Sequence, residues 1–128
     1  MPLIIREGRV HKEYGSVPPD VSRFYIMVPS SHLSEPYYLK FGDKVQAEIL
    51  EARMGEKEFE ELKGKKMELI FKSGIIYDHL FISKEDWEEN FREYGLVEAG
   101  FVISLKLNEV LYSTGERIEI FSKRDVTI

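Results

Sequence analysis

The chain has no cysteine, and this absence removes several kinds of chemistry together. Without a thiol there is no cysteine nucleophile, no thiolate metal site and no disulfide. The fold must therefore be held by packing, and 128 residues are enough to bury one ordinary core. The sequence predicts a single domain over residues 1–128, without a cofactor.

Long apolar runs and an excess of basic residues are also missing. No run approaches the roughly 18 apolar residues of a membrane span, and the charged first residues do not resemble a signal peptide. We therefore expect a cytoplasmic protein with no membrane partner. The net charge of −5 disfavours nucleic-acid binding, which depends on basic residues, and leaves only a local basic patch as a route to it.

Amide side chains are scarce. Gln46 is the only glutamine, and Asn90 and Asn108 are the only asparagines, while Glu and Lys are abundant. This composition is typical of a thermophilic source.

What the chain does contain is a pattern that occurs twice. Residues 25–29 and 39–49 (Tyr-Ile-Met-Val-Pro, then Leu-Lys-Phe-Gly-Asp-Lys-Val-Gln-Ala-Glu-Ile) have an echo in residues 80–85 and 96–105. Each copy reads strand, short helix, glycine turn, strand, with Gly42 corresponding to Gly100. We therefore predict a mainly β protein, a β-rich α+β fold, forming a small barrel from two pseudo-symmetric ββαβ halves. The boundaries are pseudo-repeat 1 at about 3–52, a connector at 53–66 and pseudo-repeat 2 at about 67–128.

Local signals place the expected elements. Ser34 is predicted to be the N-cap of a helix of barely more than one turn, and Ser83 that of a second helix ending at Gly95. The second helix should place Trp87, Phe91 and Tyr94 on one stripe facing the barrel. Residues 44–52 alternate like a half-buried strand, and the charged connector fits a short surface helix or a long hairpin tip. Whether residues 67–71 belong to the first or the second half stays open.

Residues 22–52 resemble the SpoVT/AbrB swapped-hairpin family, whose repeat runs strand, Ile-Pro, helix, Leu-Lys-Pro-Gly-Asp, strand. Val28-Pro29 and Leu39-Lys-Phe-Gly-Asp stand at those two motifs, and residues 83–85 and 94–102 resemble them again. The resemblance implies a cradle-loop barrel, related to the double-psi barrels, that one tandem chain closes alone. It also implies DNA binding by arginines on the first hairpin and at the helix start. Here the helix starts, residues 30–35 and 84–89, are nearly neutral and acidic, which departs from the family.

The basic residues of the first hairpin carry the first functional hypothesis. They lie near Tyr14, and strand pairing would gather them on one surface. The candidate DNA-binding residues are Arg6, Arg9, Lys12 and Arg23. An AbrB-like DNA-binding regulator is therefore predicted. The alternative interpretation is that these are ordinary outward-facing strand charges, partly neutralised by Glu7, Glu13 and Asp20.

A group of aromatic residues carries the second hypothesis. Exposed aromatic patches often mark protein contacts, and the candidates are Tyr37, Tyr38 and Phe41. This hypothesis is a protein-interaction or oligomerisation module without nucleic-acid contact, whose partner is a second copy or another protein.

An enzyme on a double-psi barrel is the third hypothesis. His11, His32 and His79, with Glu13 and Asp78, offer possible metal ligands, but no His-Glu-x-x-His spacing occurs. The neighbours Ser30, Ser31 and His32 do not make a triad by adjacency alone. The sequence therefore predicts no catalytic residue, no metal ligand and no enzymatic activity.

Overall fold

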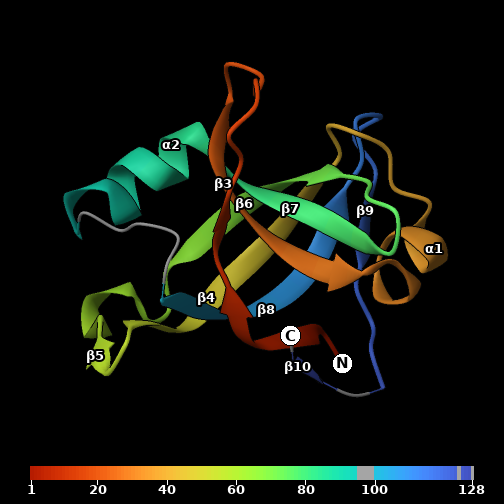
Figure 1. The fold of residues 1–128 in the computed structure, drawn as a ribbon. Helices are drawn as coiled ribbons and strands as arrows, with labels where there is room; N and C mark the ends of the chain where they lie inside the picture. Colours follow the sequence, from red (N-terminus) through yellow and green to blue (C-terminus); the bar gives the residue numbers. More distant parts are fainter. Residues whose placement is uncertain (95–99, 124, 128) are drawn as a thin grey trace.

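The computed structural model describes residues 1–94, 100–123 and 125–127. Within them the chain is mainly β, and its strands form one curled, barrel-like sheet with α1 and α2 on opposite sides of it (Figure 1). The predicted fold class is confirmed. In the described part of the chain, no helix is long and apolar enough to cross a membrane.

The elements have the following bounds. The strands are β1 (Leu3–Arg9), β2 (His11–Lys12), β3 (Val21–Pro29), β4 (Lys44–Met54), β5 (Lys57–Glu58), β6 (Lys66–Lys72), β7 (Tyr77–Ser83), β8 (Phe101–Leu111), β9 (Arg117–Glu119) and β10 (Val126–Thr127). The helical turns are η1 (Ser30–His32), α1 (Ser34–Tyr37), η2 (Glu60–Leu62), α2 (Lys84–Asp86), η3 (Trp87–Phe91) and η4 (Arg92–Tyr94). The last three are continuous, and we call them helical segment 84–94.

Two predictions on the second half fall where nothing is described. Gly95 as the end of the second helix, and residues 96–99 as the start of its glycine turn, lie outside the described residues.

The sheet runs in the order β10-β1-β8-β4-β6-β7-β3-β2. Its two ends meet through one stretch of chain, because residues 3–9 pair with β8 and residues 11–12 pair with β3. Antiparallel pairs join β3 to β7 and β4 to β8. Strand β6 pairs with β4 of the first half and with β7 of the second half. It therefore joins the two halves, to neither of which the sequence assigned it.

The core follows the predicted alternation of β4. Val45, Ala47 and Ile49 are buried, whereas Gln46 and Glu48 are partly exposed. These apolar side chains join one large cluster with residues of the other long strands and of helical segment 84–94. Burial of apolar area is the main favourable term in folding, so this cluster holds the barrel closed.

The two glycine turns have the conformation that requires glycine. Gly42 has a φ of 94° and Gly100 a φ of 81°, a region that other residues rarely enter. Each lies just before a long strand. Next to Gly42, the buried Asp43 carboxylate accepts from the backbone N–H groups of Lys40 (2.8 Å) and Ser113 (2.9 Å), which ties this turn to the β8–β9 turn.

The two predicted helix caps had different outcomes. Ser83 caps its helix as predicted, since its Oγ accepts from the Asp86 backbone N–H at 3.2 Å. The prediction for Ser34 was wrong, because the N-cap of α1 is Leu33 and no side chain of the helix caps it. Instead, the carboxylate of Asp78 on β7 accepts from the Ser34 N–H at 2.9 Å. A carboxylate from the neighbouring strand replaces the local cap.

The connector forms a hairpin and one short turn. Strand β4 continues to Met54 and pairs with β5, so the predicted hairpin tip is present, and the helical part is only η2. Phe59 and Leu62 are buried against the core. This charged stretch therefore covers one end of the barrel instead of being fully solvated.

Candidate functional site

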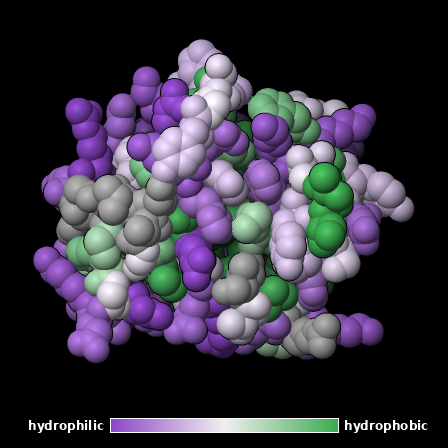
Figure 2. All heavy atoms as spheres, in the orientation of Figure 1, coloured by the Kyte–Doolittle hydropathy of each residue, from purple (hydrophilic) through white to green (hydrophobic). Residues whose placement is uncertain are grey.

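Exposed apolar side chains gather around α1, and we call this set the end patch. Their exposed fractions run from 42% at Tyr77 to 101% at Ile75. The members are Tyr38, Phe41, Ile75, Ile76, Tyr77 and Phe121. Figure 2 shows the strongest hydrophobic colour of this face where Figure 1 draws the β6–β7 loop beside α1.

Backbone hydrogen bonds hold the segments of the end patch together. The Ser30 N–H donates to the Ile76 carbonyl at 3.0 Å, and the Gly42 N–H donates to the Phe71 carbonyl at 3.1 Å. The segment that carries Tyr38 and Phe41 is therefore tied at both ends to the β6–β7 hairpin. The patch is one surface built from distant parts of the chain.

The Tyr37 side chain connects Phe121 to this surface. Its hydroxyl accepts from the Phe121 N–H at 2.7 Å, and its carbonyl accepts from the Tyr112 hydroxyl at 2.6 Å. Burial, with a smaller effect of Asp43, raises the pKa of the Tyr112 hydroxyl, which keeps it a donor. Tyr37 is thus partly buried and positions its neighbours.

The fully buried Asp78 carboxylate holds the start of α1 by hydrogen bonds. It accepts from the hydroxyls of Ser30 (3.0 Å) and Ser34 (2.8 Å) as well as from the Ser34 N–H. Three donors to one carboxylate satisfy a buried charge well. At the other end of α1, Tyr38 has a φ of 53° and a side chain that is 83% exposed. Asp78 is a structural clamp on the element that presents Tyr38.

Charged residues of both signs surround the end patch. Glu35 and Lys40 flank Tyr38 along the chain, Lys72 precedes the β6–β7 loop, Glu116 lies in the β8–β9 turn, and Lys123 follows Phe121. All five are exposed, and none makes an ion pair within the described residues. The rim therefore carries charges of both signs.

The sequence found part of this site. Tyr38 and Phe41 are exposed members of the end patch, whereas Tyr37 supports it. Ile75 and Ile76 were not among the predicted interaction residues. The strand begins at Tyr77, and two isoleucines next to a Ser-Gly turn were the available signal.

Two of the predicted DNA-binding residues are engaged by the protein itself. Arg6 makes an ion pair with Asp125 at 2.6 Å. The Arg23 guanidinium donates to the carbonyl of Gly15 at 2.6 Å and to that of Glu13 at 3.2 Å. These contacts fix local structure.

Strand register separates Lys12 from Arg23. Lys12 is opposite Phe24 and sits 5.6 Å from the centre of the Tyr14 ring. Arg23 precedes Phe24 and so projects to the other face of the same ribbon. Arg9 lies opposite Val102 of β8.

The three histidines named above as possible metal ligands have different surroundings. His11 and His79 stack with Tyr25, with ring centres 5.4 and 4.6 Å from it, and His32 lies in η1. Within the described parts of the chain, no group of three His, Asp or Glu residues is arranged to hold a metal ion. Burial, together with Lys72, lowers the pKa of the His79 imidazole, so its neutral form is favoured in this stack.

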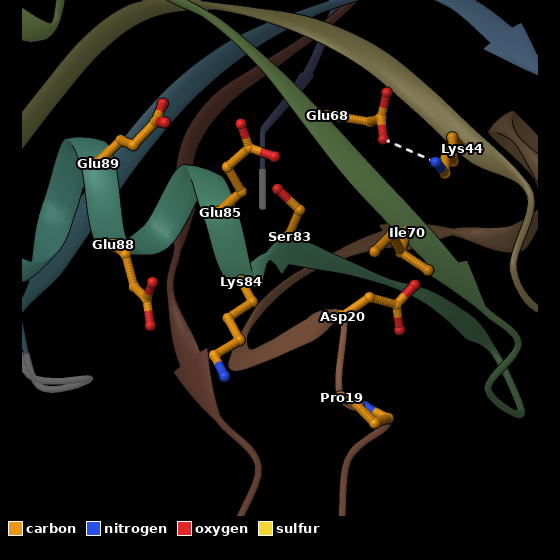
Figure 3. A pocket seen from close by; sticks show the side chains of 10 residues that line it. All are labelled: Pro19, Asp20, Lys44, Glu68, Ile70, Ser83, Lys84, Glu85, Glu88 and Glu89. Atoms are coloured by element: carbon orange, nitrogen blue, oxygen red, sulfur yellow. Dashed lines mark ion pairs between the residues drawn. The ribbon is translucent and has the colours of Figure 1, made fainter.

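A hollow of about 430 Å³ lies between the β2–β3 loop, β6 and the start of α2 (Figure 3). Half of its ten lining residues are acidic and two are basic, and the Glu68 carboxylate makes an ion pair with the Lys44 ammonium group at 3.1 Å. Glu88 points away from Glu68 in Figure 3. Glu85, Glu88 and Glu89 lie in the first turns of helical segment 84–94, where negative charge suits the helix dipole.

Comparisons with protein-family models, with curated proteins and with solved structures found no match. The fold and the site therefore define the class by themselves: a mainly β protein with a curled, barrel-like sheet and an apolar patch at one end. The resemblance to the SpoVT/AbrB family stays a prediction.

Proposed function

We propose that this protein is a non-enzymatic binding module that contacts another protein surface through the end patch. One observation carries the proposal, namely the six large apolar side chains left exposed around α1. With roughly 200 Å² for each large side chain and the exposed fractions above, the patch offers on the order of 800 Å². Contiguous apolar surfaces of this size on soluble proteins are typical of interaction sites.

The construction of the patch supports the same function. Asp78, Tyr37 and the two backbone hydrogen bonds fix the segments that present the apolar residues. A surface that is ordered before binding loses less conformational entropy when a partner docks. Exposed tyrosine and phenylalanine side chains in such a surface are the residue types that commonly dominate binding energy.

In-cell photo-crosslinking tests the proposal. A photoreactive phenylalanine analogue replaces Tyr77 in the end patch or, as the control, Tyr14, which is 73% exposed in the β2–β3 loop. We expect protein adducts from position 77 that are missing from position 14. Equal adduct patterns from both positions, or none, would exclude the end patch as a protein contact.

DNA binding is the second candidate, and one observation favours it. Arg9 is exposed and lies opposite Val102, which on its other side pairs with Arg53, so two arginines flank one position of β8, and Arg53 also makes ion pairs with Glu7 at 3.1 Å and Glu51 at 3.5 Å. The test is a titration of random duplex DNA with the wild type and with Arg9→Glu. Binding that falls steeply with salt and is lost in the variant supports this candidate, and no binding at low salt rejects it.

We further infer that the two halves of the chain are related copies, as the family resemblance implies. The reciprocal pairing supports this inference: β3 pairs with β7, β4 pairs with β8, and β4 and β8 each take a partner from the other half, β6 and β1. A crystal structure in which residues 3–52 do not superpose on residues 67–111 would contradict it.

A further inference from the structure

We propose that the occupant of the end patch is a second copy of this chain, bound about a twofold axis. This inference rests on the proposed function of the patch and names its partner. In a twofold interface the same surface is used by both copies, so the surface must be complementary to itself in shape, apolar area and charge.

The apolar area fits a dimer of ordinary size. The end patch offers on the order of 800 Å², and a stable protein interface buries about 800 Å² on each partner. Ile75 and Ile76 are 101% and 69% exposed at the tip of the β6–β7 hairpin, where they are the first residues to meet an approaching surface. Two patches facing each other supply an apolar interface without any further partner.

The charges around the patch point to the same occupant. Two copies of a chain with a net charge of −5 repel each other overall. The rim of the patch, however, carries both signs (Lys40, Lys72 and Lys123 with Glu35 and Glu116), so each copy can place cations opposite anions of the other. Nucleic acid or an anionic membrane surface would call for a rim dominated by basic residues.

The hairpin tip is held in its exposed form. A Cβ atom at Gly74 would clash with the Tyr77 carbonyl oxygen, so glycine suits this turn. The Ile76 carbonyl accepts from the Ser30 N–H, which fixes the loop against η1. Ile75 and Ile76 are exposed in the turn that these contacts hold.

Sedimentation equilibrium of the purified full-length chain over a range of concentrations tests the proposal. The variants are Ile75→Ser with Ile76→Ser in the patch and Tyr14→Ser as the matched exposed control. We expect a wild-type dimer, an increase of at least about tenfold in the dimer dissociation constant for the patch variant, and no change for the control. Tyr38→Ser is a second patch variant that should weaken the dimer through a different segment.

The other outcomes separate this inference from the proposed function. A wild-type chain that is monomeric at every concentration but gives protein adducts from position 77 overturns the second copy and leaves the protein contact standing. A monomer without adducts overturns both. Binding of a monomeric wild type to anionic phosphatidylserine vesicles, lost in the patch variant, assigns the patch to a membrane surface and also overturns the dimer. A dimer whose dissociation constant is unchanged in both patch variants also overturns the end patch as the dimer interface.

Discussion

Helical segment 84–94 and α1 occupy comparable positions, each directly after one of the two strands β7 and β3 that pair with each other. Segment 84–94 packs two of its rings on the barrel: Phe91 is fully buried, and the partly buried Trp87 ring stacks on Phe24 with ring centres 3.6 Å apart. Helix α1 buries none of its four residues and is followed by an 83% exposed Tyr38. Segment 84–94, the packed arm, covers the core, and α1, the presenting arm, leaves neighbouring apolar side chains exposed to solvent.

The difference lies in how each arm is attached. Segment 84–94 carries its own cap and buries a ring of its own, whereas α1 receives the Asp78 carboxylate and is anchored in the core through its buried neighbours Leu33 and Leu39 and its partly buried Tyr37. Tyr38 and Phe41 stay exposed beside these anchors. Changes in the two arms should therefore have different consequences for folding and for association.

The largest expected effect is on the packed arm. Phe91→Ala removes a fully buried ring that contacts Trp87 and Phe101, so it should lower the free energy of unfolding by about 3–5 kcal/mol. Urea denaturation measures this change. Tyr38→Ala, on the presenting arm, should alter it by no more than about 0.5 kcal/mol under conditions where the chain is monomeric. Similar losses for both variants would erase the distinction between the arms.

The next effect concerns the polar attachment of α1. Asp78→Ala leaves the Ser34 N–H and two serine hydroxyls without their buried acceptor, and we expect a loss of about 2–3 kcal/mol in the same assay. Hydrogen exchange should accelerate in residues 30–38 and stay unchanged in 84–91. Asp20→Ala, at an exposed carboxylate, is the control and should be close to neutral. Acceleration spread evenly over both arms would mean that Asp78 supports the whole barrel.

A smaller effect is expected at the cap of the packed arm. Ser83→Ala removes the hydroxyl that accepts from the Asp86 N–H and should cost about 1 kcal/mol of unfolding free energy. Ser31→Ala, at an exposed position of η1, should cost almost nothing. If the two substitutions are equivalent, the local cap contributes no stability to segment 84–94.

The smallest effect is a pH dependence of the unfolding free energy caused by His79, which follows Asp78 in β7. Burial and Lys72 lower the pKa of this imidazole in the folded chain, against the opposing influence of Glu13 and Asp78. The unfolded chain then binds the proton more tightly, so stability falls as the pH drops below about 6.5 and levels off below the folded pKa. Urea denaturation of the wild type should show a larger loss between pH 7.5 and 5.5 than that of His79→Gln. An equal loss in both proteins would refute this assignment.

The sequence predicted the parts of the fold that depend on local patterns. The alternation along β4, the glycine turns at Gly42 and Gly100 and the cap at Ser83 each use neighbouring residues, and all three are confirmed. The attachment of α1 was missed because Asp78 lies 44 positions from Ser34, and no local signal marks that contact.

The candidate site was predictable in part for the same reason. Tyr38 and Phe41 follow a proline-containing helical turn and were identified from composition alone. The contribution of Ile75 and Ile76 depends on where strand β7 begins, and that of Phe121 depends on its contact with Tyr37 across 84 positions. Register places Lys12 and Arg23 on opposite faces of their ribbon.

The most direct test of the account is an electron-spin distance measurement between copies of the chain. Because the chain has no cysteine, Ser73→Cys places one spin label beside the end patch, and Ser16→Cys places one in the β2–β3 loop as the control. We expect a defined distance between labels at position 73 and a longer or undetectable one between labels at position 16. The reverse order of distances, or no coupling at position 73 at concentrations where the wild type is dimeric, would contradict a dimer formed through the end patch.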